Sequence, residues 1–283
     1  MLWRFVLSLA LATPALSAEE PIRVVVSVPP LEYLVERVGG PRVQVQSMVQ
    51  PGFSPATYEP TPKQVTNLAG ADLYVRTGVP FENAWLTRFR SANPDMRVLD
   101  AREGLEVQMS DRHGDHDRHD PHVWTSPPLA GHMARNIRDA LIALAPGDAT
   151  AFEAGYAALN AELGALDEEL RQILSDLPTS RFMVYHPAWG HFAERYGLTQ
   201  IAIEKDAKEP SARALIALID EAKRDGITVV FIQPQFDRRL AEQVARAIGG
   251  HVEVLDPLSP DYMENLREIA RRIAAAGTVP AQR

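Results

Sequence analysis

Half of the chain's eight histidines lie in one short acidic segment, DRHGDHDRHDPHVWTSP, at residues 111–127. His113, His116 and His119 recur at every third position among aspartates, and His122 follows in DPHV. Imidazole nitrogens and carboxylate oxygens are common ligands of zinc and related divalent metals. The segment therefore suggests metal binding, either weakly along its length or at an ordered site. A solvated loop without a role is the alternative for the part that ends at His119.

His122 differs from the other three histidines in its surroundings. Pro121 disfavours helix for the residue before it, and a helix is predicted to begin near Pro127 or Pro128. His122 should therefore lie in a loop that leads into a helix, where ligands are often found. A capping or surface histidine is the alternative.

Two further candidates end apolar runs that are typical of buried strands. His186 follows FMVY, and Asp256 follows VEVL; each precedes a proline. Ligands of parallel sheets bind beyond the carboxyl ends of the strands. Two imidazoles and one carboxylate suit zinc. The three residues are far apart in the sequence, so no spacing motif supports this ligand set. A hydrogen-bonded core histidine and a turn aspartate are the alternatives, and His191, on the following helix, is predicted to be structural.

The elements that must position these side chains alternate between strand and helix. IRVVVSV at 22–28 is a β-branched run typical of a buried parallel strand, and PPLEYLVERVGG continues as a helix that begins at proline and ends at glycine. From Arg181 the pattern restarts, and YHPAWGHFAERYGL resembles SVPPLEYLVERVGG when Pro187 is aligned with Pro29. The sequence therefore predicts an α/β fold of two similar lobes with mostly parallel sheets.

A long helix is predicted between the lobes. Its apolar positions are separated by alternating steps of four and three, which forms one stripe: Phe152, Tyr156, Leu159, Leu163, Leu166, Leu170, Ile173 and Leu177. A helix of this length spans roughly 40 Å. A coiled-coil dimer is the alternative, but so short an apolar stripe between two folded lobes fits a rigid helix that packs within one chain better. Such a helix would limit closure of the lobes.

These patterns divide the chain into predicted segments. We expect an N-terminal lobe over 22–146, which includes a flexible His-rich loop over 111–121, a linking helix over 148–177 and a C-terminal lobe over 180–283. Residues 1–18 resemble a secretory signal peptide, because Arg4 precedes a short apolar run and small residues follow. A buried N-terminal strand or helix is the alternative.

Composition excludes several classes of site and partner. The chain has no cysteine, so disulfides, thiolate metal sites and a lipid-anchoring cysteine are absent. The formal net charge is −8 and no basic cluster offsets it, which argues against a nucleic-acid partner. We therefore expect a soluble, exported protein whose metal ligands are His, Asp or Glu.

Over nearly its whole mature length, the chain resembles the periplasmic zinc- and manganese-binding proteins of metal ABC importers, the cluster A-I solute-binding proteins. The shared pieces occur in family order: TYEPTPKQV, DPHVWTSP, YHPAWGHFAERYGL, EPSA, FIQPQFD and LDPLSPDYMENLREIA. Any one piece is a weak signal, whereas the ordered set is specific. The resemblance implies two α/β lobes joined by a long helix, with the metal in the cleft between them.

The resemblance also implies a ligand set and a partner. His122, His186 and Asp256 correspond to metal ligands. Manganese members tend to carry glutamate at the position of His186, so the resemblance favours Zn²⁺ over Mn²⁺. The implied protein is a periplasmic, monomeric receptor that docks on the membrane permease of an ABC importer, and not an enzyme.

One departure from the family puts the ligand set in doubt. The family usually has histidine where GFSPATYEP places Ala56, and alanine cannot bind metal. The fourth position would fall to water, to Glu59 or Glu204, or to a loop histidine. A second departure is Gln233, where the family commonly has glutamate.

Three functions remain open from the sequence. The first is a zinc receptor with a rearranged site. The second is a receptor for a metal chelate or small organic ligand, with Ala56 making room. The third is a zinc hydrolase that uses an open coordination position, for which no HExxH-type motif is present.

Overall fold

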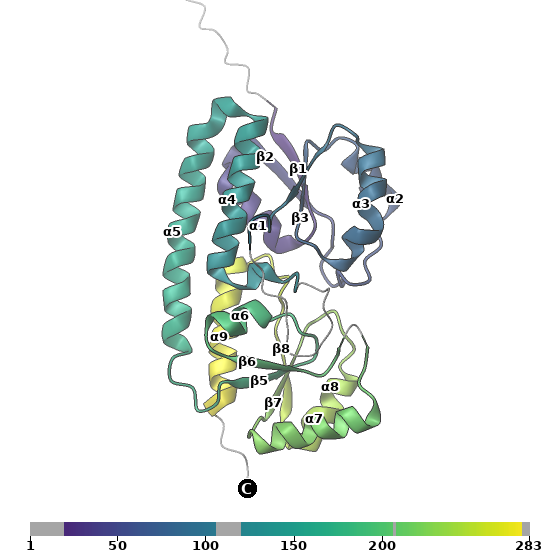
Figure 1. The fold of residues 1–283 in the computed structure, drawn as a ribbon, viewed down its shortest axis with the longest axis vertical. Coiled ribbons are helices and arrows are strands. Elements are labelled where there is room, and N and C mark those ends of the chain that lie inside the picture. The colour runs from purple at the N-terminus through teal and green to yellow at the C-terminus, as the bar shows by residue number, and fades with distance from the viewer. Residues whose placement is uncertain (1–19, 106–119, 206–207, 279–283) are drawn as a thin grey trace, which may run out of the picture.

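The computed structural model describes residues 20–105, 120–205 and 208–278. The residues predicted as a signal peptide and nearly all of the predicted His-rich loop, including His113, His116 and His119, lie outside this described part. Two four-stranded parallel sheets lie one above the other in Figure 1. The predicted fold class of two α/β lobes with a long joining helix is confirmed.

The first lobe has the strand order β2-β1-β3-β4. Its strands and connecting helices are β1 (Ile22–Val26), α1 (Pro29–Gly39), β2 (Val43–Ser47), α2 (Pro62–Leu68), β3 (Leu73–Arg76), α3 (Pro80–Ala92) and β4 (Arg97–Asp100). Four of the five residues of β1 are buried, as its β-branched sequence predicts. The helix α4 (Pro127–Leu144) follows, preceded by the 3-10 turn η2 (Val123–Thr125).

The second lobe repeats this arrangement with the order β6-β5-β7-β8. Its elements are β5 (Arg181–Val184), α6 (Gly190–Arg195), β6 (Thr199–Ala202), α7 (Ala212–Arg224), β7 (Val229–Ile232), α8 (Arg239–Ile248), β8 (His251–Val254) and α9 (Tyr262–Thr278). In each lobe the first strand pairs with the second and third, and the fourth is at an edge. The carboxyl ends of the central strands are therefore the places where each lobe offers ligands.

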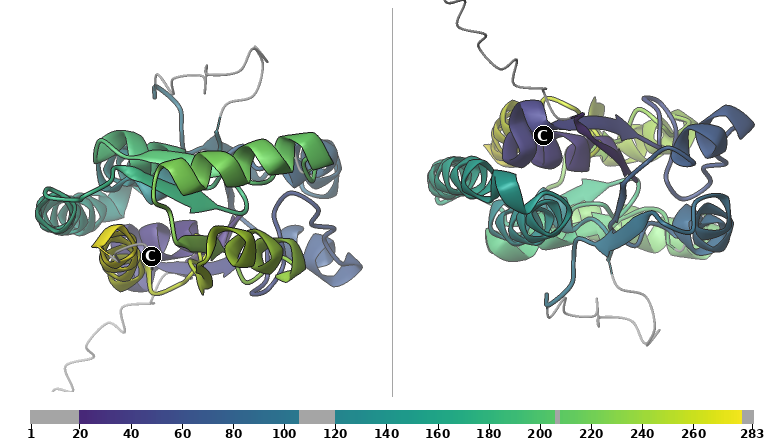
Figure 2. Two further views of the ribbon diagram at one scale, coloured as in Figure 1. Left: turned by 90° about the horizontal axis from the view of Figure 1, so that it is seen from below. Right: turned by 90° about the horizontal axis from the view of Figure 1, so that it is seen from above.

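The joining helix α5 (Ala149–Ile173) packs on α1, α4 and α9 of its own chain. Both end views in Figure 2 place it along one side of the molecule. The predicted helix extended to residue 177; the observed one stops at Ile173, and Leu177 only packs partly buried against the core. Its stripe residues Phe152, Leu159 and Leu163 are fully buried or nearly so, which leaves no exposed seam for a coiled-coil dimer.

The two lobes share one hydrophobic core. Phe182 and Val184 of β5 belong to the same buried cluster as Leu166 of α5, while Met183 between them faces a second cluster beneath α7 and α8. Successive strand residues point to opposite faces of the sheet, so one face of the second sheet packs toward α5 and α9. Within the described residues, no helix is long and apolar enough to cross a membrane.

Ion pairs hold α5 to elements on both sides. Arg37 of α1 lies 2.6 Å from Glu162, and Arg267 of α9 lies 2.7 Å from Glu169. Between them, the Asp167 carboxylate accepts hydrogen bonds from Arg195 of α6 at 2.5 and 2.8 Å. Because the Asp167 side chain is only 10% exposed, we expect its contribution to exceed that of the exposed pairs.

Asp167→Asn should lower the free energy of unfolding by about 2 kcal/mol at pH 7. Hydrogen bonds from Arg195 outweigh the effect of burial and hold the pKa of Asp167 below its ordinary value. A depressed folded-state pKa stabilises the fold above the unfolded-state pKa, about 3.9, and that contribution is lost as the pH falls through the folded-state value. Urea unfolding should therefore show a difference from wild type that shrinks below about pH 4; a difference independent of pH would contradict this account.

Candidate metal centre

His122 and His186 meet although they lie 64 positions apart in the chain. His122 precedes η2, and His186 lies two residues beyond β5. Their ring centroids are 5.4 Å apart and their planes cross at 77°. Both side chains are largely buried, at 14% and 19% exposure. Two of the three predicted ligands are thus in direct contact.

Each of these rings has a carboxylate at its Nδ1 atom. Asp120 Oδ1 lies 2.6 Å from Nδ1 of His122, and Glu204 Oε1 lies 3.1 Å from Nδ1 of His186. A neutral imidazole that donates its Nδ1 proton leaves the Nε2 lone pair for a metal. Neither Nε2 atom has a hydrogen-bond partner among the described residues. The arrangement matches the carboxylate–histidine–metal pattern of zinc proteins.

The protonation state of Asp120 fits this role. Burial by itself would raise the pKa of its carboxyl group, but the His122 ring, the His191 ring and the His122 backbone N–H together hold that pKa below the ordinary value. Asp120 therefore remains an anion that accepts hydrogen bonds. Its backbone carbonyl also accepts a hydrogen bond from His191 Nε2 at 3.1 Å, so His191 has the structural contact predicted for it.

Asp256 lies two residues beyond β8 but is engaged elsewhere. Its Oδ1 accepts hydrogen bonds from Gln235 Nε2 at 3.1 Å and from the Leu258 N–H at 3.0 Å. In residues 20–105, 120–205 and 208–278, no group of three or more His, Cys, Asp or Glu side chains is arranged to hold a metal. The structure therefore joins the two histidines but leaves Asp256 outside their contact, and its assignment stays a prediction.

The segments that carry His122 and Asp256 are nevertheless tied together. The buried Trp124 donates from Nε1 to the Pro257 carbonyl at 2.7 Å, and its own carbonyl accepts a hydrogen bond from Tyr262 at 2.6 Å. The Trp124 ring also lies edge-on to His122, with centroids 5.3 Å apart. These contacts hold the segment of His122 beside the chain that follows Asp256.

The loop after β7 contacts both second-lobe candidates. Phe236 stacks on His186, with centroids 5.2 Å apart, next to Gln235, which holds Asp256. Gln233 donates to the His186 carbonyl at 2.9 Å, so the residue that departs from the family pattern fixes the backbone of a candidate ligand.

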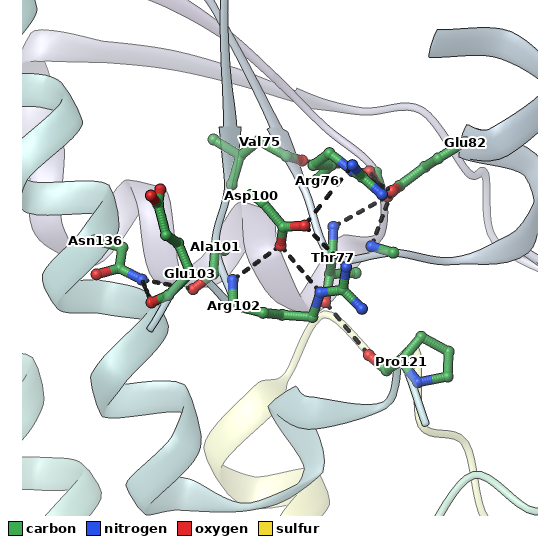
Figure 3. A network of polar contacts seen from close by, with 12 residues as sticks. Val75, Arg76, Thr77, Glu82, Asp100, Ala101, Arg102, Glu103, Pro121 and Asn136 are labelled. Carbon is green, nitrogen blue, oxygen red and sulfur yellow. Dashed lines mark hydrogen bonds and ion pairs between the residues drawn. The ribbon is translucent and has the colours of Figure 1, made fainter. Parts of the chain in front are cut away.

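The first lobe holds the His122 segment through a buried carboxylate, drawn in Figure 3. Glu82 is fully buried and accepts hydrogen bonds from Ser27 Oγ at 2.5 Å, the backbone N–H groups of Thr77 and Gly78 at 3.0 and 2.8 Å, and Arg76 Nε at 2.9 Å. All of its partners lie at or near the carboxyl ends of β1 and β3. This network fixes the turn that faces the metal-site segment.

Thr77 connects that network to the site. Its hydroxyl donates to the Pro121 carbonyl at 3.3 Å, one residue before His122.

The buried Glu82 also affects a neighbouring tyrosine. Burial and the negative charge of Glu82 raise the pKa of Tyr74, which keeps the Tyr74 hydroxyl neutral beside Ser27. The sequence gives little sign of this role for Glu82, because acidic residues are common in the first turn of any helix and α3 begins at Pro80.

The remaining candidates have different surroundings. Glu59 is exposed, and Ala56 sits partly buried in a local turn where its N–H donates to Ser54 Oγ at 3.2 Å. Glu204 is buried and bound to His186 at Nδ1, the position of a supporting carboxylate. The sequence did not lead us to a role for Asp120. An aspartate that accepts a hydrogen bond from the backbone N–H two residues later is, however, a recognisable turn signal.

Comparison with known proteins shows the family to which this fold belongs. A family model described as zinc-uptake complex component A, periplasmic (ZnuA), matches residues 24–276. A crystal structure of a zinc-bound ZnuA deletion mutant is similar with a TM-score of 0.87 and 41% identity, covering 92% of this chain and 99% of that one. The high-affinity zinc uptake system protein ZnuA of Paracoccus denitrificans is 32% identical over 95% of this chain and 96% of its own length.

A second group of relatives is longer. The zinc-binding lipoprotein AdcA of Streptococcus pneumoniae is 30% identical over 85% of this chain, which spans only about half (51%) of AdcA. The matched family model covers nearly all of the described residues, including both lobes and the joining helix. The chain belongs to the ZnuA family of periplasmic zinc-uptake components.

Proposed function

We propose that this chain is an exported receptor that captures zinc(II) in the periplasm, as a monomer, and delivers it to the membrane permease of an ABC importer. The observation that carries the proposal is the pair of facing histidines, each with a carboxylate at Nδ1 and an Nε2 that has no partner within the described part of the chain. The ZnuA family consists of transport receptors and not enzymes, which argues against the zinc-hydrolase alternative.

The proposed ligands are Nε2 of His122, Nε2 of His186 and a carboxylate oxygen of Asp256. To bind the metal, Asp256 would exchange its hydrogen bonds with Gln235 and the Leu258 N–H for the ion. Two imidazoles and one carboxylate favour zinc over manganese. The family usually has a histidine ligand at the position of Ala56, and water would complete a tetrahedral site in its place. Glu204 would stay hydrogen-bonded to His186.

The first test is a calorimetric zinc titration of the chain without its signal residues, with and without residues 111–119. We expect one tight site in both proteins and additional weak sites only in the protein that retains the three loop histidines. This result would make the loop an auxiliary collector, separate from the main site.

Two other outcomes would change the proposal. A tight site that weakens more than about tenfold on loop deletion would mean that a loop histidine completes the coordination. The absence of a tight site in a folded protein would mean that Ala56 has removed binding of the bare ion. Zinc chelates of histidine or citrate would then be titrated to test a chelate receptor.

A further inference from the structure

We propose that Gly190 is a positioning residue for zinc: it leaves the space in which Asp120 orients His122. This inference rests on the proposed zinc site and goes beyond its ligands. It assigns the second lobe a role in holding a ligand that belongs to the segment between β4 and α4. The argument depends on the contacts of Asp120 and on the space above α6.

Asp120 is fixed on three sides. Its Oδ1 accepts a hydrogen bond from the His122 N–H at 3.0 Å and lies 2.6 Å from Nδ1 of the same residue. Its carbonyl accepts from His191 Nε2 at 3.1 Å, and its side chain is only 13% exposed. An aspartate side chain is short, so Oδ2 cannot move far without turning Oδ1 away from the ring.

Gly190, the first residue of α6, lies against Oδ2, the second oxygen of this carboxylate, which is also 4.0 Å from His191 Nε2. A Cβ atom built on Gly190 would be 2.6 Å from Asp120 Oδ2 and 3.4 Å from Gln200 Nε2. The first distance is shorter than real contacts allow, so a side chain at this position must displace Asp120. Gln200 cannot easily give way, because its Oε1 accepts a hydrogen bond from the Trp189 N–H at 3.1 Å.

Space, and not backbone conformation, explains the glycine. Gly190 is absent from the glycines with positive φ, so any residue could adopt its backbone angles. The neighbouring His191 binds the Asp120 carbonyl, so two consecutive residues of the second lobe hold the same aspartate. The orientation of His122 is therefore set jointly by its own segment and by the start of α6.

The test measures zinc affinity by competition with a chromophoric chelator, using the chain without its signal residues. We expect Gly190→Ala to weaken binding about 10- to 100-fold, as loss of an outer-shell partner typically does. Asp120→Ala should weaken it similarly. The double variant should bind no more than about threefold worse than Asp120→Ala alone, because the added methyl group then has no carboxylate to displace.

A matched control separates this role from a general packing defect. In Gly131→Ala the new Cβ would lie 2.8 Å from the Asn160 side-chain oxygen, between α4 and α5. This clash resembles the one at Gly190 but involves none of the groups that contact the two rings. Gly131→Ala should keep wild-type zinc affinity within about threefold, whatever its effect on the melting temperature.

The possible outcomes are distinguishable. Wild-type affinity in Gly190→Ala, or fully additive losses in the double variant, would overturn the role of Gly190 while leaving a zinc site that depends on His122 in place. A wild-type protein without such a site would overturn both proposals. Should Gly190→Ala fail to fold, the isosteric Asp120→Asn keeps the packing and should still weaken zinc about tenfold; unchanged affinity in that variant would overturn the inference.

Discussion

Replacing either His122 or His186 by alanine is expected to weaken zinc binding by about 10³-fold or more. Structural zinc sites bind with about 10–16 kcal/mol shared among three or four ligands, so one ligand is worth roughly 4 kcal/mol, or about three orders of magnitude. Each ring is held by its own carboxylate, and its Nε2 has no hydrogen-bond partner among the described residues, so the loss of one ring should remove a ligand that those residues do not replace. Calorimetry with competing chelator measures the loss.

The control for this prediction is His251→Ala. His251 is 58% exposed on β8, where its ring lies 3.1 Å from Glu253, and it should bind no zinc at the main site. Wild-type affinity in His122→Ala or His186→Ala would remove that residue from the ligand set. Equal losses in His251→Ala would indicate weak binding to surface histidines instead of an ordered centre.

Glu82→Ala should lower the free energy of unfolding by about 3–5 kcal/mol, the largest stability effect expected for a single substitution in the first lobe. The variant would leave Arg76 without its buried partner and two backbone N–H groups without their acceptor. The Ser27 hydroxyl would keep only its contacts with the Tyr74 hydroxyl and the Val75 carbonyl. Urea unfolding of the zinc-free protein measures the change. The same variant should also loosen the Thr77 contact to the Pro121 carbonyl.

An exposed glutamate provides the control. Glu153 lies on the exposed face of α5, and Glu153→Ala should change the stability by no more than about 0.5 kcal/mol. A loss below about 1 kcal/mol in Glu82→Ala would show that water replaces the carboxylate at the turn after β3. The network would then not account for the position of the His122 segment.

The fold could be predicted because its signals are local and repeated. β-branched runs, helices that begin at proline and the restart at Arg181 predicted two similar lobes, and both sheets have the same strand order. The alternating spacing along α5 predicted a buried stripe. The end of that helix was placed too far along the chain: Pro178 disfavours helix at Leu177, and the chain turns after Ile173.

The sequence by itself determined the chemistry that is available. It supplied histidines, aspartates and glutamates without cysteine, placed His186 and Asp256 beyond strand ends and placed His122 in a loop before a helix. The ordered motifs of the family connected these residues to zinc. These features follow from residue type and chain position, which short-range patterns record.

Only the tertiary structure decided how these groups meet. It brought His122 to His186, gave Glu204 to one ring and Asp120 to the other, and set Gly190 against that aspartate. It also kept Asp256 on Gln235, apart from the two rings. Each of these contacts joins residues from elements whose relative placement depends on the shared core of both lobes, and no local pattern of sequence encodes a distance across that core.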